Sequence, residues 1–260
     1  MIVSLRALLG ASVTLSLACI ATPLLAQQGD EQYLTAGHRR RTVSPQNFAA
    51  EVRFGLFNPA IDSDPSLQGA PYKEVFGTAP RLLVSAELDW QAYRIPHFGS
   101  IGPGVGLGYA SMSDPAPFQT PHNGSILSGE TTTLEIVPFY AVAVVRVDAL
   151  WRELHVPLVP YVKAGLADAL WRASNTLGTS TVNGVSGEGH SFGTHYAFGL
   201  ALNLNPFDPY AAGGFDDAMG VNNTYIFGEY TRDDLTGLGL QSGVLRVGGP
   251  AWTFGFAFEF

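Results

Sequence analysis

The side chains that most resemble a catalytic set lie between residues 188 and 195. Glu188, His190, Ser191 and His195 offer a carboxylate, two imidazoles and a hydroxyl. A serine, a histidine and an acid within hydrogen-bond reach can together activate a nucleophile for ester hydrolysis or transfer. Nothing in the spacing brings the three groups together, so we assign no catalytic residue and keep an enzyme as an alternative.

Metal and nucleotide binding fit the sequence poorly. His190 and His195 are five positions apart, and two strand residues at that spacing point to opposite faces, so they are poor joint ligands. The glycines between residues 102 and 108 lack the third glycine of a dinucleotide motif. Solvated charge is a simpler interpretation than Ca²⁺ binding for the loop aspartates, Asp114, Asp216, Asp217, Asp233 and Asp234. We expect no cofactor.

The composition indicates an acidic chain with few charges. Of 260 residues, 14 are Lys or Arg and 22 are Asp or Glu, which gives a formal net charge of −8. Charged residues make up 14%, against roughly 25% in ordinary soluble domains. Nucleic-acid binding would require a basic face, so we expect no nucleic-acid partner.

The N-terminus has the layout of a secretory signal peptide over residues 1–26. Arg6 precedes an apolar stretch that runs to about Ile20, and small residues come before Gln27. Cleavage after Ala26 would remove Cys19, the only cysteine, and so exclude disulfides and thiolate metal sites. Residues 27–46 are polar and aperiodic, which indicates a flexible segment. We expect one domain over residues 47–260.

From Phe48 onward the apolar residues recur with a period of two, as in half-exposed strands. In the run that starts at Phe48, Val52 and Phe54 share one face while Glu51 and Arg53 lie on the other. The run over 131–148 is less regular, because Val137, Phe139 and Val145 interrupt its apolar set, and Pro138 suggests a bulge. That apolar set is Leu134, Ile136, Tyr140, Val142 and Val144.

Eight such runs of about 10–14 residues predict an all-β, eight-stranded antiparallel up-and-down transmembrane β-barrel. The runs are separated alternately by long and short connections, as in outer-membrane barrels. The long ones are 58–80, 113–130, 173–190 and 233–242. The shorter ones are 94–100, 149–156 and 205–220, and we expect a short helix in the last. In such a barrel the apolar faces meet lipid, and closure leaves no unpaired strand edge.

An eight-stranded barrel is just wide enough for side chains to fill it, which predicts a plugged lumen. Buried charges must pair, so we expect Arg53 and Lys163 to meet Glu51, Glu87 or Asp89. The glycines of 102–108 would leave room for long side chains from across the barrel. The expected polar network comprises Glu51, Arg53, Glu87, Asp89, Gln91, Lys163, His195, Asn203 and Glu259.

The chain ends in an aromatic stripe that we interpret as a lipid-facing last strand. Its members are Trp252, Phe254, Phe256, Phe258 and Phe260. A C-terminal Phe preceded by alternating apolar residues resembles the signal that the outer-membrane assembly machinery recognises. The expected partners are therefore that machinery, outer-membrane lipid and lipopolysaccharide, in a Gram-negative cell envelope.

Several motifs resemble a family of eight-stranded outer-membrane β-barrel proteins of the myxobacterial type. They are "PYVKAGL" followed by "LW" (160–171), "GEY" (228–230), the ending "AWTFGFAFEF", "FGLFNPAID" (54–62) and "VFG" (75–77). The resemblance covers about residues 48–260. It implies the barrel fold and the outer membrane, and because the family has no assigned activity it adds no catalytic residue.

The sequence thus favours a non-enzymatic outer-membrane protein with a structural, envelope or loop-mediated interaction role. Three alternatives stay open. One is a barrel enzyme that modifies lipid A or phospholipid through the set at 188–195. Another is a narrow channel for small hydrophobic solutes, and the last is a soluble carrier of the lipocalin type.

Overall fold

The computed structural model describes residues 47–118, 126–182, 185–239 and 244–260, apart from residues 66 and 68. The expected signal peptide and the segment 27–46 lie outside the described residues. No helix in the described part of the chain is long and apolar enough to cross a membrane.

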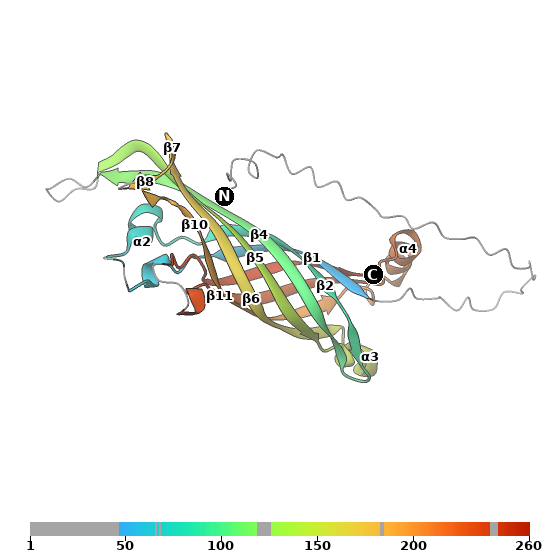
Figure 1. Ribbon diagram of the computed structural model, residues 1–260. Coiled ribbons are helices and arrows are strands. Elements are labelled where there is room, and N and C mark those ends of the chain that lie inside the picture. The colour runs from blue at the N-terminus through green and yellow to red at the C-terminus, as the bar shows by residue number, and fades with distance from the viewer. Residues whose placement is uncertain (1–46, 66, 68, 119–125, 183–184, 240–243) are drawn as a thin grey trace, which may run out of the picture. The chain divides into compact units, whose positions relative to one another are not determined.

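Eight long strands form a closed antiparallel barrel, which confirms the predicted fold (Figure 1). Each long strand pairs with the long strands before and after it in the chain, and β12 returns to pair with β1. The long strands are β1 (Phe48–Phe57), β2 (Arg81–Trp90), β4 (Gly99–Phe118), β5 (Ile126–Arg146), β6 (Leu158–Asn175), β10 (Glu188–Asn203), β11 (Asn223–Asp234) and β12 (Pro250–Glu259).

The two ends of the barrel domain meet at the seam between β1 and β12. The backbone N–H of Phe48 donates to the carbonyl of Phe260 at 2.8 Å, and the N–H of Phe260 donates back to Phe48 at 3.0 Å. The two rings also stack, with 6.2 Å between their centroids. Because the seam is paired, neither strand presents a free edge, which an apolar surrounding would not tolerate.

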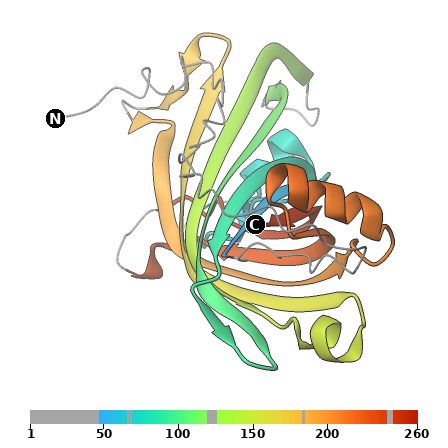
Figure 2. The same ribbon diagram turned by 90° about the vertical axis from the view of Figure 1, so that its right-hand side faces the viewer.

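One rim carries the C-terminus together with α3 (Ala149–Leu154), α4 (Pro209–Met219) and the short strand β3 (Tyr93–Ile95), as Figure 2 shows. We call it the α4 rim. The helix α4 confirms the one expected in the connection 205–220. The Asp208 side chain accepts a hydrogen bond from the N–H of Ala211 at 2.9 Å and so caps its start, and Gly220, at φ 71°, ends it.

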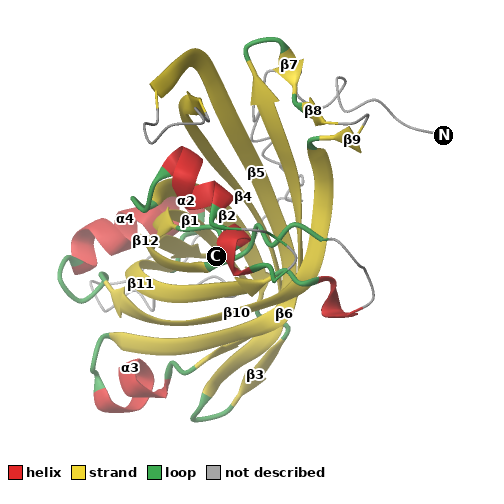
Figure 3. Cartoon of the chain, turned by 90° about the vertical axis from the view of Figure 1, so that its left-hand side faces the viewer, coloured by secondary structure: helices red, strands yellow, loops and turns green. Residues whose placement is uncertain are grey.

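The opposite rim, the α2 rim, carries the remaining short elements (Figure 3). They are η1 (Ile61–Ser63), α2 (Pro71–Phe76), β7 (Gly178–Thr179), β8 (Thr181–Val182), β9 (Val185–Ser186) and η2 (Gly237–Gly239). The Asp62 carboxylate accepts from the N–H groups of Tyr72 and Lys73 at 2.8 and 2.9 Å. These two bonds tie η1 to the first turn of α2.

Two connections expected to be long loops are largely strand. The β4–β5 hairpin continues past the barrel wall, so most of 113–130 is strand. In 173–190, β6 and β10 take up three residues each, and β7, β8 and β9 take up two each. The register shift of the hairpin lies between Pro115 and Pro117, so the bulge expected at Pro138 is wrong. Polar composition made the hairpin look like a loop, yet its threonines suit paired strands.

The outer wall of the barrel is a belt of exposed apolar side chains that alternate with buried neighbours. Phe254 is 61% exposed and Leu107 58% exposed, although both lie in the middle of long strands. No layer of the described residues covers the belt, so its natural solvent is hydrocarbon. The belt includes Phe54, Leu56, Leu82, Val105, Leu107, Val162, Leu166, Phe198, Phe254 and Phe256.

The strand β5 turns its apolar set inward, contrary to the sequence interpretation. Leu134 and Ile136 are buried in the lumen at 4% and 1% exposure, as are Tyr140, Val142 and Val144. Phe139, Ala141 and Ala143 alternate with these buried residues and face outward. Since both faces of this strand are apolar, its alternation alone does not indicate which side faces the lumen.

Candidate functional site

Most side chains of the barrel lumen form two layers, and a smaller apolar cluster that includes Tyr161, Tyr225 and Phe227 lies against the charged one. A charged layer lies toward the α4 rim and an apolar layer lies toward the α2 rim. The charged layer consists of Glu51, Arg53, Glu87, Asp89, Arg146, Lys163, Glu229 and Glu259, of which none is more than 6% exposed. The apolar layer includes Phe57, Ile61, Tyr72, Phe76, Leu83, Met112, Leu134 and Ile136.

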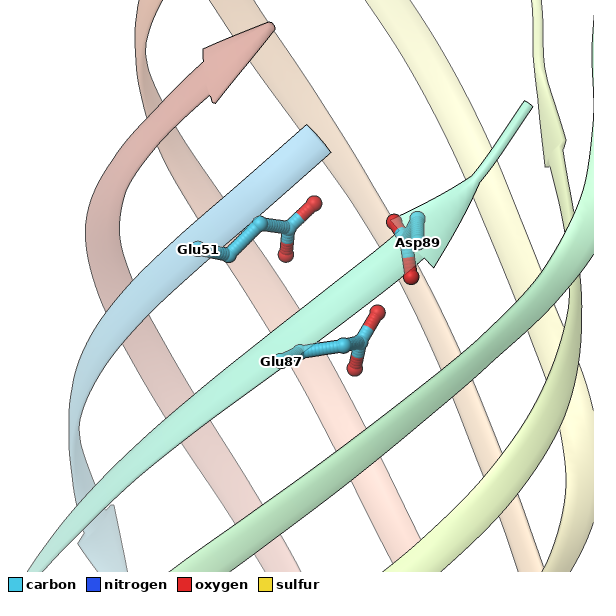
Figure 4. Close-up of side chains that lie close together, drawn as sticks. All are labelled: Glu51, Glu87 and Asp89. Carbon is cyan, nitrogen blue, oxygen red and sulfur yellow. The ribbon is translucent and has the colours of Figure 1, made fainter. Parts of the chain in front are cut away.

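Three carboxylates form the centre of the charged layer (Figure 4). Glu51 comes from β1, whereas Glu87 and Asp89 come from β2, and one oxygen of each lies within 4.8 Å of the others. Glu51 and Glu87 are direct partners across the two strands. Like charges at such positions repel, so the arrangement requires cations from the facing wall.

Lys163 on β6 is one of those cations. Its Nζ lies 2.9 Å from Glu51 Oε2, 2.6 Å from Glu87 Oε1 and 3.5 Å from Glu229 Oε2. The same ammonium lies 4.9 Å from the centre of the Tyr161 ring. Lys163 therefore joins β6 to β1, β2 and β11 through the interior.

Two arginines complete the ion pairing. Arg53 pairs with Glu51, with Glu87 at 2.7 Å and with Glu229 at 3.5 Å. Arg146 pairs with Glu51, with Asp89 at 3.0 Å and with Glu259 at 3.9 Å.

Neutral donors supplement the cations at two of the carboxylates, Glu87 and Glu259. The Tyr140 hydroxyl donates to Glu87 Oε2 at 2.7 Å, and Arg53 in turn donates to that hydroxyl. Glu259 accepts hydrogen bonds of 2.8 to 3.0 Å from Gln91, Asn223 and Tyr225. The charged layer is thereby a single cross-braced network rather than a set of separate pairs.

The three central carboxylates have the chemistry of a divalent-metal site, but their partners leave little room for one. Two of the three bind the Lys163 ammonium, and Arg146 bonds Glu51 and Asp89. A metal ion would have to displace these cations, so the residues present do not fit a resident metal.

The nine side chains expected in the lumen separate into three groups. Five of them, Glu51, Arg53, Glu87, Asp89 and Lys163, meet in the charged layer, while Gln91 and Glu259 bond each other at its α4 side. His195 stacks on Tyr140 at 4.1 Å and approaches Asp233 Oδ1 at 2.6 Å. Asn203 joins the group of Gln91 and Glu259, because it donates to Asn223 at 3.1 Å and Asn223 donates to Glu259 at 3.0 Å.

Sequence reasoning missed Arg146 and Glu229, which complete the network. Glu229 is fully buried on β11, a strand whose run "VNNTYIFGEYTR" shows no clear apolar face. Arg146 ends β5 and lies on the face that the structure turns into the lumen, contrary to the sequence interpretation. The requirement that buried charges pair could have indicated Arg146, because three clustered carboxylates call for more cations than Arg53 and Lys163.

The glycines of β4 provide the space that the sequence indicated, but for side chains of neighbouring strands. A Cβ on Gly106 would lie 2.2 Å from the Tyr140 ring, and one on Gly104 would lie 2.2 Å from Asp89 Oδ1. Tyr140 comes from β5 and Asp89 from β2, the two strands that pair with β4.

The apolar layer is closed at the α2 rim by the first connection. Ile61 of η1, with Tyr72 and Phe76 of α2, is buried against Met112 and Leu134 of the barrel wall. Burial raises the pKa of the Tyr72 phenol above its ordinary value. The two short helical segments thus pack apolar side chains against the barrel wall at this end of the lumen.

The groups considered for catalysis do not assemble. Ser191 points inward and donates to the Leu245 carbonyl at 2.6 Å, whereas His190 points outward and pairs with Asp168 at 3.2 Å. His195 points inward, but its partner is Asp233. Within the described residues, no serine or threonine hydroxyl is hydrogen-bonded to either histidine.

Comparison with solved structures finds outer-membrane proteins at low sequence identity. Ail, the attachment invasion locus protein of Yersinia pestis, in complex with a heparin analogue, is 12% identical at a TM-score of 0.38, over 83% of this chain and 97% of that chain. The N-terminal β-barrel domain of Pseudomonas aeruginosa OprF is 14% identical at 0.33, over 83% and 98%. Acinetobacter baumannii CarO is 13% identical at 0.31, over 85% and 100%.

No family model and no curated protein matches the sequence. Membership of the myxobacterial-type family therefore stays a prediction. The class of the protein, an eight-stranded transmembrane-type barrel, rests on the strand pairing and on the exposed apolar belt.

Proposed function

We propose that this chain is a non-enzymatic outer-membrane β-barrel protein with a plugged lumen. Its role is that of an envelope protein whose wall contacts lipid and whose α2 rim faces the exterior. The observation that carries the proposal is the filled interior, in which a charged layer and an apolar layer lie one above the other.

The charged layer is costly to open, which favours a scaffold over a channel. A solute crossing the barrel would have to separate Lys163 and Arg53 from carboxylates that are themselves out of reach of water. Breaking a buried pair leaves an uncompensated charge, at a cost of about 3–5 kcal/mol. The apolar stopper formed by η1 and α2 would also have to move.

The lipid-modifying enzyme is less well supported. Such an enzyme needs its nucleophile, base and acid within hydrogen-bond reach at the leaflet boundary. Ser191 instead faces the lumen, fully buried, while His190 lies on the lipid side of the wall.

Cell fractionation and planar bilayers test the proposal together. We expect the processed chain in the outer-membrane fraction, no conductance steps above the bare bilayer, and an unchanged mass spectrum of lipid A after expression. A large porin, whose lumen is an aqueous channel, is the positive control for conductance. Steady conductance would overturn the plugged lumen, a new lipid A species would overturn the non-enzymatic role, and a soluble monomer would overturn the location.

A further inference from the structure

We propose that a cleft at the α2 rim binds the phosphate group of a phosphorylated glycolipid in the outer leaflet. The cleft has a volume of about 340 Å³ and lies where the ends of β11 and β12 meet η1. Its polar lining includes Ser63, Arg232, Asp233, Asp234 and Arg246. The inference rests on the outer-membrane location proposed above and names a lipid partner for it.

Two arginines in the cleft lack the carboxylate partners that five of the eight described arginines have. Arg53, Arg81, Arg94, Arg146 and Arg152 each form an ion pair with an Asp or Glu.

Arg232 and Arg246 form none with any described carboxylate. Arg246 Nη1 donates to the Ser63 carbonyl at 3.3 Å, and Arg232 is exposed. Arginine presents a planar fork of donors that matches phosphate oxygens, so two of them at one cleft suit a phosphate group.

The cleft lies at the level where the lipid belt ends. Arg232 pairs with Pro250, and eleven residues run from Pro250 to the C-terminal Phe260, about the 9–11 that cross the hydrocarbon. Just below it, Tyr230 contacts Trp252 and Phe198 with 5.2 Å between ring centroids in each pair. Aromatic girdles mark the membrane interface, so lipid phosphates lie at the height of Arg232.

The cleft is held in shape by the backbone on both sides. The Ala60 N–H donates to the Gly248 carbonyl at 2.6 Å, and the Asp233 N–H donates to Gly249 at 3.1 Å. A Cβ at Gly249 would come within 2.1 Å of the Asn58 carbonyl, so only glycine allows this close approach. The segment that carries Arg246 is thereby fixed against β11 and η1.

The acidic residues of the cleft favour a phosphorylated sugar over a bare anion. Asp233 is engaged by His195 at 2.6 Å, which leaves Asp234 as the exposed carboxylate beside two arginines. A sugar hydroxyl next to the phosphate can donate to Asp234, whereas a free phosphate dianion would be repelled by it.

Binding to folded, detergent-solubilised protein tests the inference. Native mass spectrometry would compare diphosphorylated lipid A with the same lipid after phosphatase treatment, and ³¹P NMR would measure inorganic phosphate. We expect the double variant Arg232→Gln/Arg246→Gln to bind lipid A about tenfold more weakly, a difference of about 1.4 kcal/mol. The matched control Arg152→Gln, at the α4 rim, should bind like the unaltered chain.

A second variant, Arg232→Lys/Arg246→Lys, keeps the charge but loses the fork, and we expect it to bind more weakly than the unaltered chain. Equal lipid A binding by all variants would overturn the inference, as would equal binding of the dephosphorylated lipid. Inorganic phosphate bound as tightly as lipid A would assign the cleft to free anions and overturn the lipid source. These outcomes leave fractionation and conductance untouched, so the inference can fail while the proposed function stands.

Discussion

Lys163 shows what single residues contribute inside the barrel. Its ammonium is fully buried and touches three carboxylates from three other strands. Replacement by methionine keeps most of the volume but leaves those carboxylates without a shared cation. We expect Lys163→Met to lower the free energy of unfolding by about 3–5 kcal/mol, measured by reversible urea unfolding in lipid vesicles.

Lys73 is the matched control, because it is the only other lysine of the chain and lies exposed on α2. Lys73→Met should change the free energy of unfolding by no more than about 0.5 kcal/mol. Adding Glu87→Gln to Lys163→Met should recover part of the loss, since it removes one of the carboxylates that then outnumber the remaining cations. Equal effects of the two lysine substitutions would show that the charged layer does not stabilise the barrel.

The residues of the charged layer could be predicted where their strands alternate cleanly. Glu51 and Arg53 can be assigned to the lumen face because apolar neighbours flank them on β1. Glu87 and Asp89 can be assigned in the same way on β2. Glu229 could not be placed, because aromatic residues lie on both faces of β11. Which cation meets which carboxylate depends on the closure of the barrel and on its register, which no single strand contains.

At the scale of elements, substitutions on β12 can test which face of a strand meets lipid. Phe254 is 61% exposed near the middle of the strand, and its neighbour Thr253 is buried in the lumen. Phe254→Arg should cost about 2–4 kcal/mol of folding free energy in bilayers, because it places a charge near the bilayer midplane. Phe254→Leu keeps the site apolar and should cost far less.

Thr253→Arg offers the second comparison, because it inserts its charge into the packed lumen beside Glu229. We expect its cost to persist in detergent micelles as well as in bilayers, whereas the cost of Phe254→Arg should depend on bilayer thickness. If both substitutions responded alike to the surrounding lipid, the assignment of the two faces would be wrong.

The strands themselves were largely visible in the sequence, and the errors have one physical cause. Alternation shows which positions share a face but not which face is inside, and β5 is apolar on both. The packing of the α2 rim could not be predicted for a related reason. Its connection 58–80 is rich in turn residues, yet Ile61, Tyr72 and Phe76 fold back into the lumen once the barrel offers an apolar layer.

On the scale of the whole molecule, the two layers that we propose to plug the barrel are held in place by different contacts. Ion pairs between strands hold the charged layer together, so this layer depends only on residues of the barrel wall. The apolar layer depends on η1 and α2, which come from a single connection and touch the wall through apolar contacts. Removing that connection should therefore open the outer half of the lumen and leave the inner half closed.

Cysteine labelling from the α2 side, in a chain that lacks Cys19, can show which of the two layers a reagent reaches. Met112→Cys reports on the apolar layer, Thr253→Cys reports on the charged layer, and Leu177→Cys, at a residue 92% exposed, is the control that always reacts. In the intact chain we expect a membrane-impermeant maleimide to modify only position 177. With residues 59–79 replaced by a short Gly-Ser linker, position 112 should also react while position 253 stays protected, because water then reaches the apolar layer but stops at the ion pairs. Labelling at 253 in either chain would mean that the charged layer does not seal the barrel.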